Sequence, residues 1–352
     1  MHSLVKRLIA MKRKVEVIKA LKRTVEKDYS FKIKKWKVIK KLKNSSLVVK
    51  IVTKNGKRYA LKNLYLTSER QQFIAKSEQL LAERGVKLAS PVSTQNGRLL
   101  MKYNKNPYVL YEWIEGKSAA LRNQDDLEAI VEAMARFHQA SRQIQYPTNV
   151  KIYGHEHWEK EYKERIKTME KWSKEHKSSD SSNAAIIKKF IGFFQKMAGK
   201  ALQELQASRY DNYFNGDGSA KSLVHGDMHA NNVIDRNNEK VFIDFEDVRY
   251  DLPSKDLLRL FSMYSKNHSF HGESFSSMLK KYENHHALSS EMKKLVLIDF
   301  MFPHIFERLL RKKKYVGMES KELRHRLKQE KKKAVYVYKK YFSNNQDAEG
   351  LF

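Results

Sequence analysis

The chain of 352 residues contains no cysteine. This absence excludes disulfide bonds and thiolate metal sites, and it is compatible with a reducing cytoplasm. No apolar run approaches the length of a membrane-spanning helix, and the basic N-terminus lacks the uninterrupted apolar segment of a secretory signal. The sequence therefore predicts a cytoplasmic protein without a transmembrane segment.

Acidic residues are scarce relative to basic ones: 40 Asp and Glu stand against 70 Lys and Arg, which gives a formal net charge of +30. Such an excess attracts polyanions, including nucleic acid, anionic membranes, acidic protein layers and phosphorylated ligands. Paired zinc ligands, an RNP box and a basic zipper are all missing, so a solvated basic surface is favoured over specific nucleic-acid recognition. The 41% hydrophobic content is ample for a sizeable core, and the length predicts two lobes.

The segment 223–247 carries the pattern most indicative of chemistry. It reads as strand, tight loop, strand, turn and strand. Asp227 and Asn232 are separated by four residues, and Asp244 follows twelve residues after Asn232, at the end of the apolar run 241–243. Protein kinases use this order, with a catalytic-loop aspartate and asparagine followed by an aspartate at a strand end.

Phosphoryl transfer explains these residue types. One carboxylate must receive or orient the proton of the attacking hydroxyl, and Asp227 suits that role. Mg²⁺ prefers oxygen ligands, which the amide of Asn232 and the carboxylate of Asp244 supply. Gly226 lets the loop turn closely. The alternative is a polar hairpin loop with unrelated acidic residues, which the joint match in order, spacing and strand context disfavours.

The motif His-Gly-Asp-x-His-x-x-Asn at 225–232, followed by Ile-Asp-Phe-Glu at 243–246, resembles the aminoglycoside phosphotransferase and choline kinase group of small-molecule kinases. Segments 250–257 (Tyr-Asp-Leu-Pro-Ser-Lys-Asp-Leu) and 298–303 (Ile-Asp-Phe-Met-Phe-Pro) are similar to segments of the spore coat protein S (CotS) family of endospore-forming bacteria. The resemblance covers roughly residues 30 to 340. It implies an α+β, two-lobed protein-kinase-like fold of the aminoglycoside phosphotransferase type, with a small β-rich N-lobe and a larger, mostly helical C-lobe.

The same resemblance implies ATP and Mg²⁺ as cofactors, with Asp227 catalytic and with Asn232 and Asp244 at the metal. The loop residues that support them are His225, Gly226 and His229. Asp256 corresponds to an aspartate that braces the catalytic loop by hydrogen bonds, and a helix N-cap is the alternative for it.

The N-terminal half predicts a nucleotide site. Strands are expected at 37–42, 47–53 and 58–62, and a helix at 68–84. Lys62 ends a Tyr-Ala-Leu-Lys run that resembles the kinase strand whose lysine holds the nucleotide phosphates, and one more surface lysine is the alternative. Glu78 is the candidate ion-pair partner of Lys62, with Glu69 as the competitor.

The phosphate loop departs from the kinase pattern. Kinases carry a glycine-rich loop over the phosphates, whereas the corresponding turn here is Lys-Asn-Ser-Ser at 43–46. Ser45 and Ser46 are the candidate phosphate contacts. The missing glycines favour weak turnover. Paired strands at 98–103 and 108–113 lead to a hinge, where backbone groups of Glu112 and Ile114 would hold an adenine edge.

Helices dominate the remainder of the sequence. They are expected at 127–144, 162–175, 186–205, 256–264, 273–282, 290–311 and 320–341. His138, on the apolar face of the first, is interpreted as a packing histidine. Residues 1–27 form a basic amphipathic pattern, which can dock on a membrane or partner or pack on its own domain; the second is favoured.

The predicted organisation is an N-terminal helix at 1–30, a nucleotide-binding N-lobe at 31–113, a helical C-lobe with the acceptor site at 114–342, and a tail at 343–352. Three functions remain open. The first is an ATP- and Mg²⁺-dependent kinase for a hydroxyl of an unidentified small molecule. The second is a structural or regulatory spore coat component with little turnover, deposited in the coat with other coat proteins. The third is a polyanion-binding protein.

Overall fold

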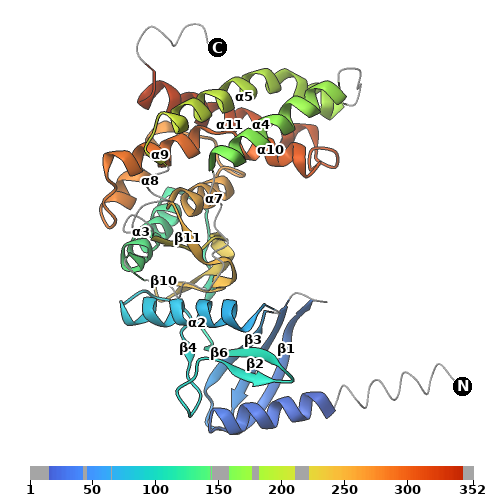
Figure 1. Ribbon diagram of the computed structural model, residues 1–352, viewed down its shortest axis with the longest axis vertical. Coiled ribbons are helices and arrows are strands. Elements are labelled where there is room, and N and C mark those ends of the chain that lie inside the picture. The colour runs from blue at the N-terminus through green and yellow to red at the C-terminus, as the bar shows by residue number, and fades with distance from the viewer. Residues whose placement is uncertain are drawn as a thin grey trace, which may run out of the picture. The chain divides into compact units, whose positions relative to one another are not determined.

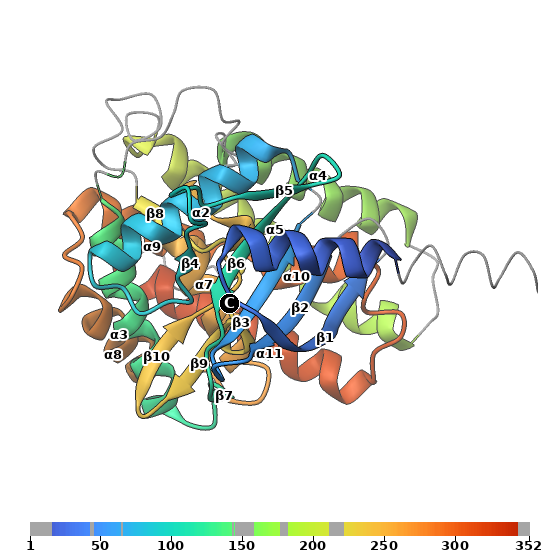
Figure 2. The ribbon, with the colours of Figure 1, turned by 90° about the horizontal axis from the view of Figure 1, so that it is seen from below.

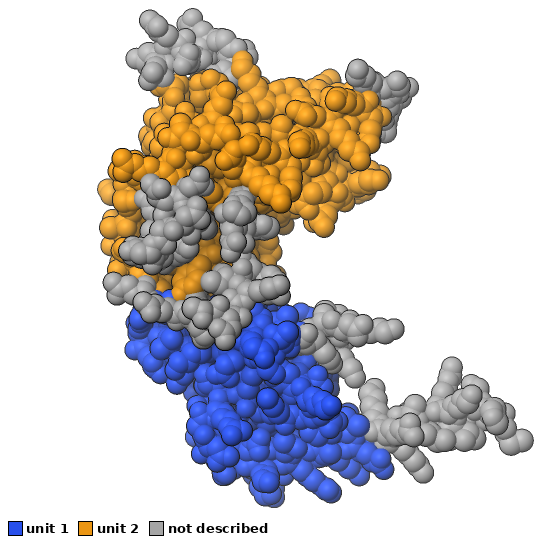
Figure 3. Space-filling view, viewed as in Figure 1, with its two compact units in different colours: residues 1–117, 144–151, 234–246 blue, residues 118–143, 152–233, 247–352 orange. Residues whose placement is uncertain are grey.

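The computed structural model describes residues 16–42, 46–64, 66–142, 144, 158–176, 182–210 and 222–343. Two compact units divide the chain, as Figure 3 shows by colour. Unit 1 holds residues 1–117, 144–151 and 234–246, and unit 2 holds residues 118–143, 152–233 and 247–352. The main segment of unit 1 ends four residues after the expected N-lobe, but residues 234–246, expected in the C-lobe, also belong to unit 1.

Unit 1 is built on an antiparallel sheet with the strand order β1-β2-β3-β6-β4, and β5 pairs with β6. The strands are β1 (Ile33–Leu42), β2 (Ser46–Thr53), β3 (Arg58–Asn63), β4 (Pro91–Val92), β5 (Met101–Tyr103) and β6 (Asn106–Glu112). The three strands predicted at the N-terminal end are confirmed, as is the pairing of the next two.

Side chains alternate between the two faces of this sheet. Leu61 packs in one cluster with Leu21 and Val25 of the helix over residues 16–28, the dark blue helix beside the sheet in Figures 1 and 2. Ala60, its neighbour in β3, packs in a second cluster with Ala75 of α2 (Ser68–Glu83). A strand alternates its side chains with period two, so each face of the sheet is covered by one helix. Within the described residues, the expected packing of the N-terminal helix on its own domain is confirmed; residues 1–15 lie outside them.

Unit 2 is mostly helical. Its helices are α3 (Gln124–Ser141), α4 (Trp158–Glu175), α5 (Ser182–Gln206), α7 (Ser254–Tyr264), α8 (Gly272–Glu283), α9 (Ser290–Met301), α10 (His304–Arg311) and α11 (Ser320–Tyr341). The single helix predicted at 290–311 is wrong, because the chain breaks between α9 and α10 at Pro303. Proline has no backbone N–H to donate and its ring collides with the carbonyl four residues earlier. No described helix is long and apolar enough to cross a membrane.

The predicted strand–loop–strand–turn–strand segment is confirmed. It consists of β8 (Ser222–Val224), a loop with the short helix η1 (Ala230–Asn232), β9 (Val233–Arg236) and β10 (Glu239–Phe242). Asn237 and Asn238 form the turn with φ of 51° and 66°, as a tight hairpin requires. After the short helix η2 (Phe245–Asp247), β11 (Arg249–Asp251) pairs antiparallel with β8. The two-residue strand β7 (Lys117–Ser118) precedes α3.

Candidate active site

The catalytic loop of unit 2 is fastened by one buried carboxylate. Asp256, in the first turn of α7, accepts hydrogen bonds from the backbone N–H groups of His225 at 2.6 Å and Gly226 at 3.0 Å. His138 of α3 lies at 3.0 Å from the same side chain and contacts the hydroxyl of Tyr282 at 2.6 Å. Asp256 thus braces the loop, as the resemblance implied. His138 is a satisfied buried histidine, as expected, but the sequence did not reveal its contact with Asp256.

The pKa of Asp256 shows why this brace stays charged. Burial acts to raise the pKa, since a carboxylate loses its hydration inside the protein. The hydrogen bonds and charges of His138 and His225 outweigh burial, and they bring the pKa of Asp256 below its usual value. An ionised carboxylate therefore holds the loop through charge-assisted hydrogen bonds, which are stronger than neutral ones.

Gly226 is required by the path of the loop. Its φ is +81°, in the left-handed region that favours glycine. A Cβ at this position would collide with the carbonyl oxygen of Asp247 and with the guanidinium of Arg249. The loop therefore passes closer to the following segment than any other residue would allow, which fixes the backbone immediately before Asp227.

Asp227 is half-buried, and two basic residues flank its side chain. Arg259 of α7 forms an ion pair with Oδ1, and Nε2 of His229 lies 3.4 Å from Oδ2. The amide group of Asn232 donates through Nδ2 to the backbone carbonyl of Asp227 at 3.1 Å. This hydrogen bond uses the nitrogen of the amide, so Oδ1 of Asn232 is the atom suited to a metal ligand.

Sequence reasoning missed Arg259. It stands three residues after Asp256 on α7, so both side chains share one helical face. That spacing could have placed Arg259 beside the loop, since Asp256 was already assigned to brace it.

In unit 1, Lys62 and Asp244 come together. Nζ of Lys62 lies 2.8 Å from Oδ1 of Asp244, and both side chains are largely buried. Alternation along β3 places Lys62 on the same face as Ala60, which is the face covered by α2. Asp244 has a φ of +71°, an uncommon conformation for a residue other than glycine, and such strain concentrates at functional positions.

The expected ion pair between Lys62 and Glu78 is absent from the described residues, because Lys62 is paired with Asp244 instead. Glu78 lies on α2 and is buried, with a hydrogen bond to Tyr111. Burial raises the pKa of Glu78 to about 8, against the lowering effects of that hydrogen bond and of the Lys62 charge. A buried glutamate that keeps its proton gains little from a lysine, which accounts for the difference. The competitor Glu69 is exposed.

Glu246 completes this cluster. Burial, and then the charge and the hydrogen bond of Asp244, raise the pKa of Glu246 to about 7. Two carboxylates so close to one another resist carrying two negative charges. A cation bound beside Asp244 would relieve this repulsion.

The expected adenine and phosphate contacts are described only in part. The backbone N–H of Glu112, at the end of β6, donates to the carbonyl of Ser90 at 3.1 Å and is not available to a ligand. Ile114 lies two residues after the end of this strand. Ser45 lies outside the described residues, and Ser46 is described only as the first residue of β2.

Residues 38–282 match the phosphotransferase enzyme family. The chain belongs to this family. The matched range includes Lys62, the loop that bears Asp227 and the segment through Asp244.

Individual relatives agree with this membership. The chain is 23% identical to spore coat protein S of Bacillus subtilis (strain 168) over 278 residues, 76% of this chain and 77% of that protein. An aminoglycoside phosphotransferase from Alicyclobacillus acidocaldarius has a TM-score of 0.71 at 16% identity and covers 93% of this chain and 95% of its own. Amicoumacin kinase hAmiN, solved with AMP-PNP, Ca²⁺ and Ami, has a TM-score of 0.57 at 18% identity and covers 95% and 96%. The two-lobed phosphotransferase fold expected from the sequence is confirmed.

Among the described residues, no group of three or more histidines or carboxylates is already arranged to hold a metal. The donor chemistry nevertheless suits a phosphotransferase metal. Mg²⁺ uses one or two protein oxygens and takes its other ligands from water and phosphates. The amide oxygen of Asn232 and the carboxylate of Asp244 are oxygens of this kind.

Proposed function

We propose that this phosphotransferase is a kinase that transfers the γ-phosphoryl group of ATP to a hydroxyl of a small molecule. The observation that carries the proposal is the environment of the Asp227 side chain. Asp256 and Gly226 fix the loop that bears Asp227, and the side chain of Asp227 lies between Arg259 and His229. A carboxylate held in this position can orient an attacking hydroxyl and receive its proton.

We assign nucleotide binding to the cluster of unit 1 that contains Lys62 and Asp244. We assign Lys62 to the phosphates and Asp244, with Asn232, to Mg²⁺. Bound Mg²⁺ would neutralise charge on the transferring phosphate. In the absence of nucleotide Lys62 is neutralised by Asp244, so the proposal requires that pair to loosen when phosphate oxygens arrive. The backbone at Glu112 and Ile114 is assigned to adenine, and Ser45 and Ser46 to the phosphates.

A second candidate function is assembly of the spore coat with little or no turnover. The similarity to spore coat protein S favours it, and so does the phosphate turn without glycine. The two functions are compatible, because a coat component can also be an enzyme. They differ in whether the role in the cell depends on Asp227.

Thermal unfolding with and without millimolar Mg²⁺–ATP tests nucleotide binding. A ligand that binds only the native state stabilises it by about 2.7 kcal/mol at a concentration one hundred times its Kd. We expect a rise in Tm for the wild-type chain and a much smaller rise for Lys62→Gln. Lys54→Gln, at an exposed position after β2, is the matched control and should respond as the wild type does. A wild-type Tm that Mg²⁺–ATP leaves unchanged would overturn the proposal.

A further inference from the structure

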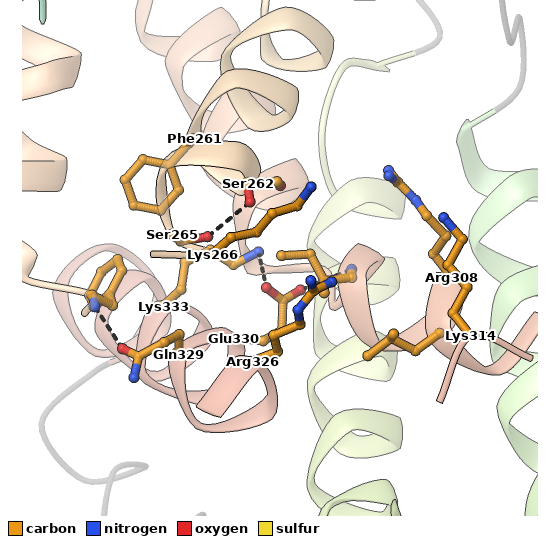
Figure 4. A pocket seen from close by; sticks show the side chains of 13 residues that line it. Phe261, Ser262, Ser265, Lys266, Arg308, Lys314, Arg326, Gln329, Glu330 and Lys333 are labelled. Atoms are coloured by element: carbon orange, nitrogen blue, oxygen red, sulfur yellow. Dashed lines mark hydrogen bonds and ion pairs between the residues drawn. The ribbon is translucent and has the colours of Figure 1, made fainter. Parts of the chain in front are cut away.

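A small pocket lies within unit 2, where the C-terminal end of α7 meets α10 and α11. Figure 4 shows side chains from these elements converging on it. Its volume is about 100 Å³, and Phe261, Phe270 and Leu309 provide apolar, buried parts of its lining. Pockets for drug-sized ligands measure roughly 300–1,000 Å³, so this one suits a single small chemical group.

The charged part of the lining is mainly cationic. Five basic side chains face the pocket: Lys266, Arg308, Lys314, Arg326 and Lys333. Glu330 is the one acidic residue of the lining, and its carboxylate is already engaged. It accepts a hydrogen bond from the backbone N–H of Ile305 at 3.2 Å and pairs with Nζ of Lys333 at 3.1 Å. Within the lining, Glu330 therefore compensates Lys333 alone.

Three of these cations have no acidic partner among the described residues: Lys266, Arg308 and Lys314. A fourth, Arg326, pairs with Glu322 through Nη2, but its Nε is buried without a hydrogen-bond partner. Burial lowers the pKa of Lys266, and the charges of Arg326, Lys314 and Arg308 lower it further. Mutual repulsion of this kind destabilises the empty pocket and would be relieved by an anion.

Arg259 connects the surroundings of the pocket with Asp227. It lies on α7 and forms an ion pair with Asp227, and Lys266 follows the end of the same helix at Tyr264. The charge of Arg259 also contributes to lowering the pKa of both Lys266 and Arg308. Arg259 thus pairs with Asp227 and also interacts electrostatically with the cations of the pocket, which connects the pocket with the proposed acceptor position.

We propose that the pocket binds an anionic group, a phosphate or a carboxylate, of the molecule whose hydroxyl is phosphorylated. This inference rests on the proposed kinase function and narrows its substrate class. The cationic lining would repel polyamine-like acceptors and attract acceptors that carry negative charge. Guanidinium groups and lysines are suited to phosphate and carboxylate oxygens, which they bind by charge-assisted hydrogen bonds.

Binding of inorganic phosphate, measured by calorimetry at constant ionic strength and without nucleotide, tests the pocket independently of kinase activity. We expect the double variant Lys266→Gln/Arg308→Gln to bind phosphate at least tenfold more weakly than the wild type. Both side chains are exposed at the rim, so their replacement should leave the fold intact. The control Lys328→Gln/Lys332→Gln removes the same charge from exposed positions of α11 outside the pocket and should bind as the wild type does.

Two results would overturn the inference. If phosphate binding weakens equally in the pocket variant and the control variant, the effect comes from net charge in general. Loss of phosphate binding in Lys62→Gln, with the pocket variant unaffected, would place the anion at the proposed nucleotide site instead.

A competition experiment distinguishes phosphate from carboxylate as the group that the pocket binds. Glycerol 3-phosphate, glycerate and glycerol are compared as competitors of bound phosphate. Competition by either anion, with none from glycerol, supports the inference, and the stronger competitor identifies phosphate or carboxylate as the preferred group. Competition by glycerol equal to that of the anions contradicts it. If Mg²⁺–ATP leaves Tm unchanged but phosphate binds in the pocket, the kinase proposal is rejected and the anion site is retained.

Discussion

Lys62 in β3 and Asp244 after β10 lie 182 residues apart in the sequence, yet their side chains meet at 2.8 Å within unit 1. The pair joins the strand lysine of a kinase pattern directly to the aspartate assigned to the metal. Glu78, buried behind them on α2, keeps its proton near neutral pH instead of pairing with the lysine. In the proposed site, Lys62 is therefore held by the same carboxylate that would bind the metal ion.

Replacement of Asp244 by asparagine should abolish the Mg²⁺ dependence of nucleotide binding. Asparagine tolerates the left-handed φ of this residue but removes the charge that pairs with Lys62, so stability should fall and folding of the variant is verified by urea denaturation. The measurement is ATP affinity at several Mg²⁺ concentrations. Glu246→Gln is the matched control and should retain the dependence. If Glu246→Gln loses it while Asp244→Asn does not, the metal has been assigned to the wrong carboxylate.

Alanine at Gly226 should destabilise the fold more than alanine at Gly85. Both glycines have positive φ, 81° and 83°, so each substitution carries a backbone cost of about 1 kcal/mol. Only at Gly226 does the added Cβ meet the Asp247 carbonyl, since nothing lies within 4 Å at Gly85. Urea denaturation should show an additional loss of about 2 kcal/mol for Gly226→Ala. Equal losses would mean that the close approach of the loop is unimportant.

Glu78 should make stability depend on pH. Its pKa is about 8 in the native state, against an ordinary value of 4.5, so between these values the native state holds a proton that the unfolded chain has released. Stability should therefore fall as pH rises from about 5 to 8, by roughly 1 kcal/mol per pH unit. Denaturation of Glu78→Gln across this range should show a flatter profile. Glu69→Gln, an exposed change on the same helix, should follow the wild type; a Glu78→Gln profile as steep as the wild type would contradict the assignment.

Local patterns in the sequence predicted most elements correctly. Alternation and turn residues located β1 to β3, and helical periodicity with Gly85 located α2. The order of Asp227, Asn232 and Asp244 indicated the phosphotransferase family, which the match over residues 38–282 confirms.

Long-range contacts were harder to predict. The sequence indicated that Lys62 needs an acidic partner but could not tell which, because the choice depends on the burial that lets Glu78 keep its proton. Arg259 was missed because it belongs to no motif, although it contacts the motif's central residue. The break at Pro303 was missed because the apolar pattern continues across it, while the missing N–H of proline determined the outcome.

In the proposed reaction, Asp227 orients the hydroxyl that receives phosphate. The most direct test of this role is the rate of transfer of labelled γ-phosphate from Mg²⁺–ATP to hydroxyl compounds with and without an anionic group, by the wild type and by Asp227→Asn. Asparagine keeps the size of the side chain and removes its charge, so ATP affinity should change little. Transfer by the variant should fall at least one hundredfold, or about 3 kcal/mol of transition-state stabilisation. Transfer by Asp227→Asn at the wild-type rate would contradict the account.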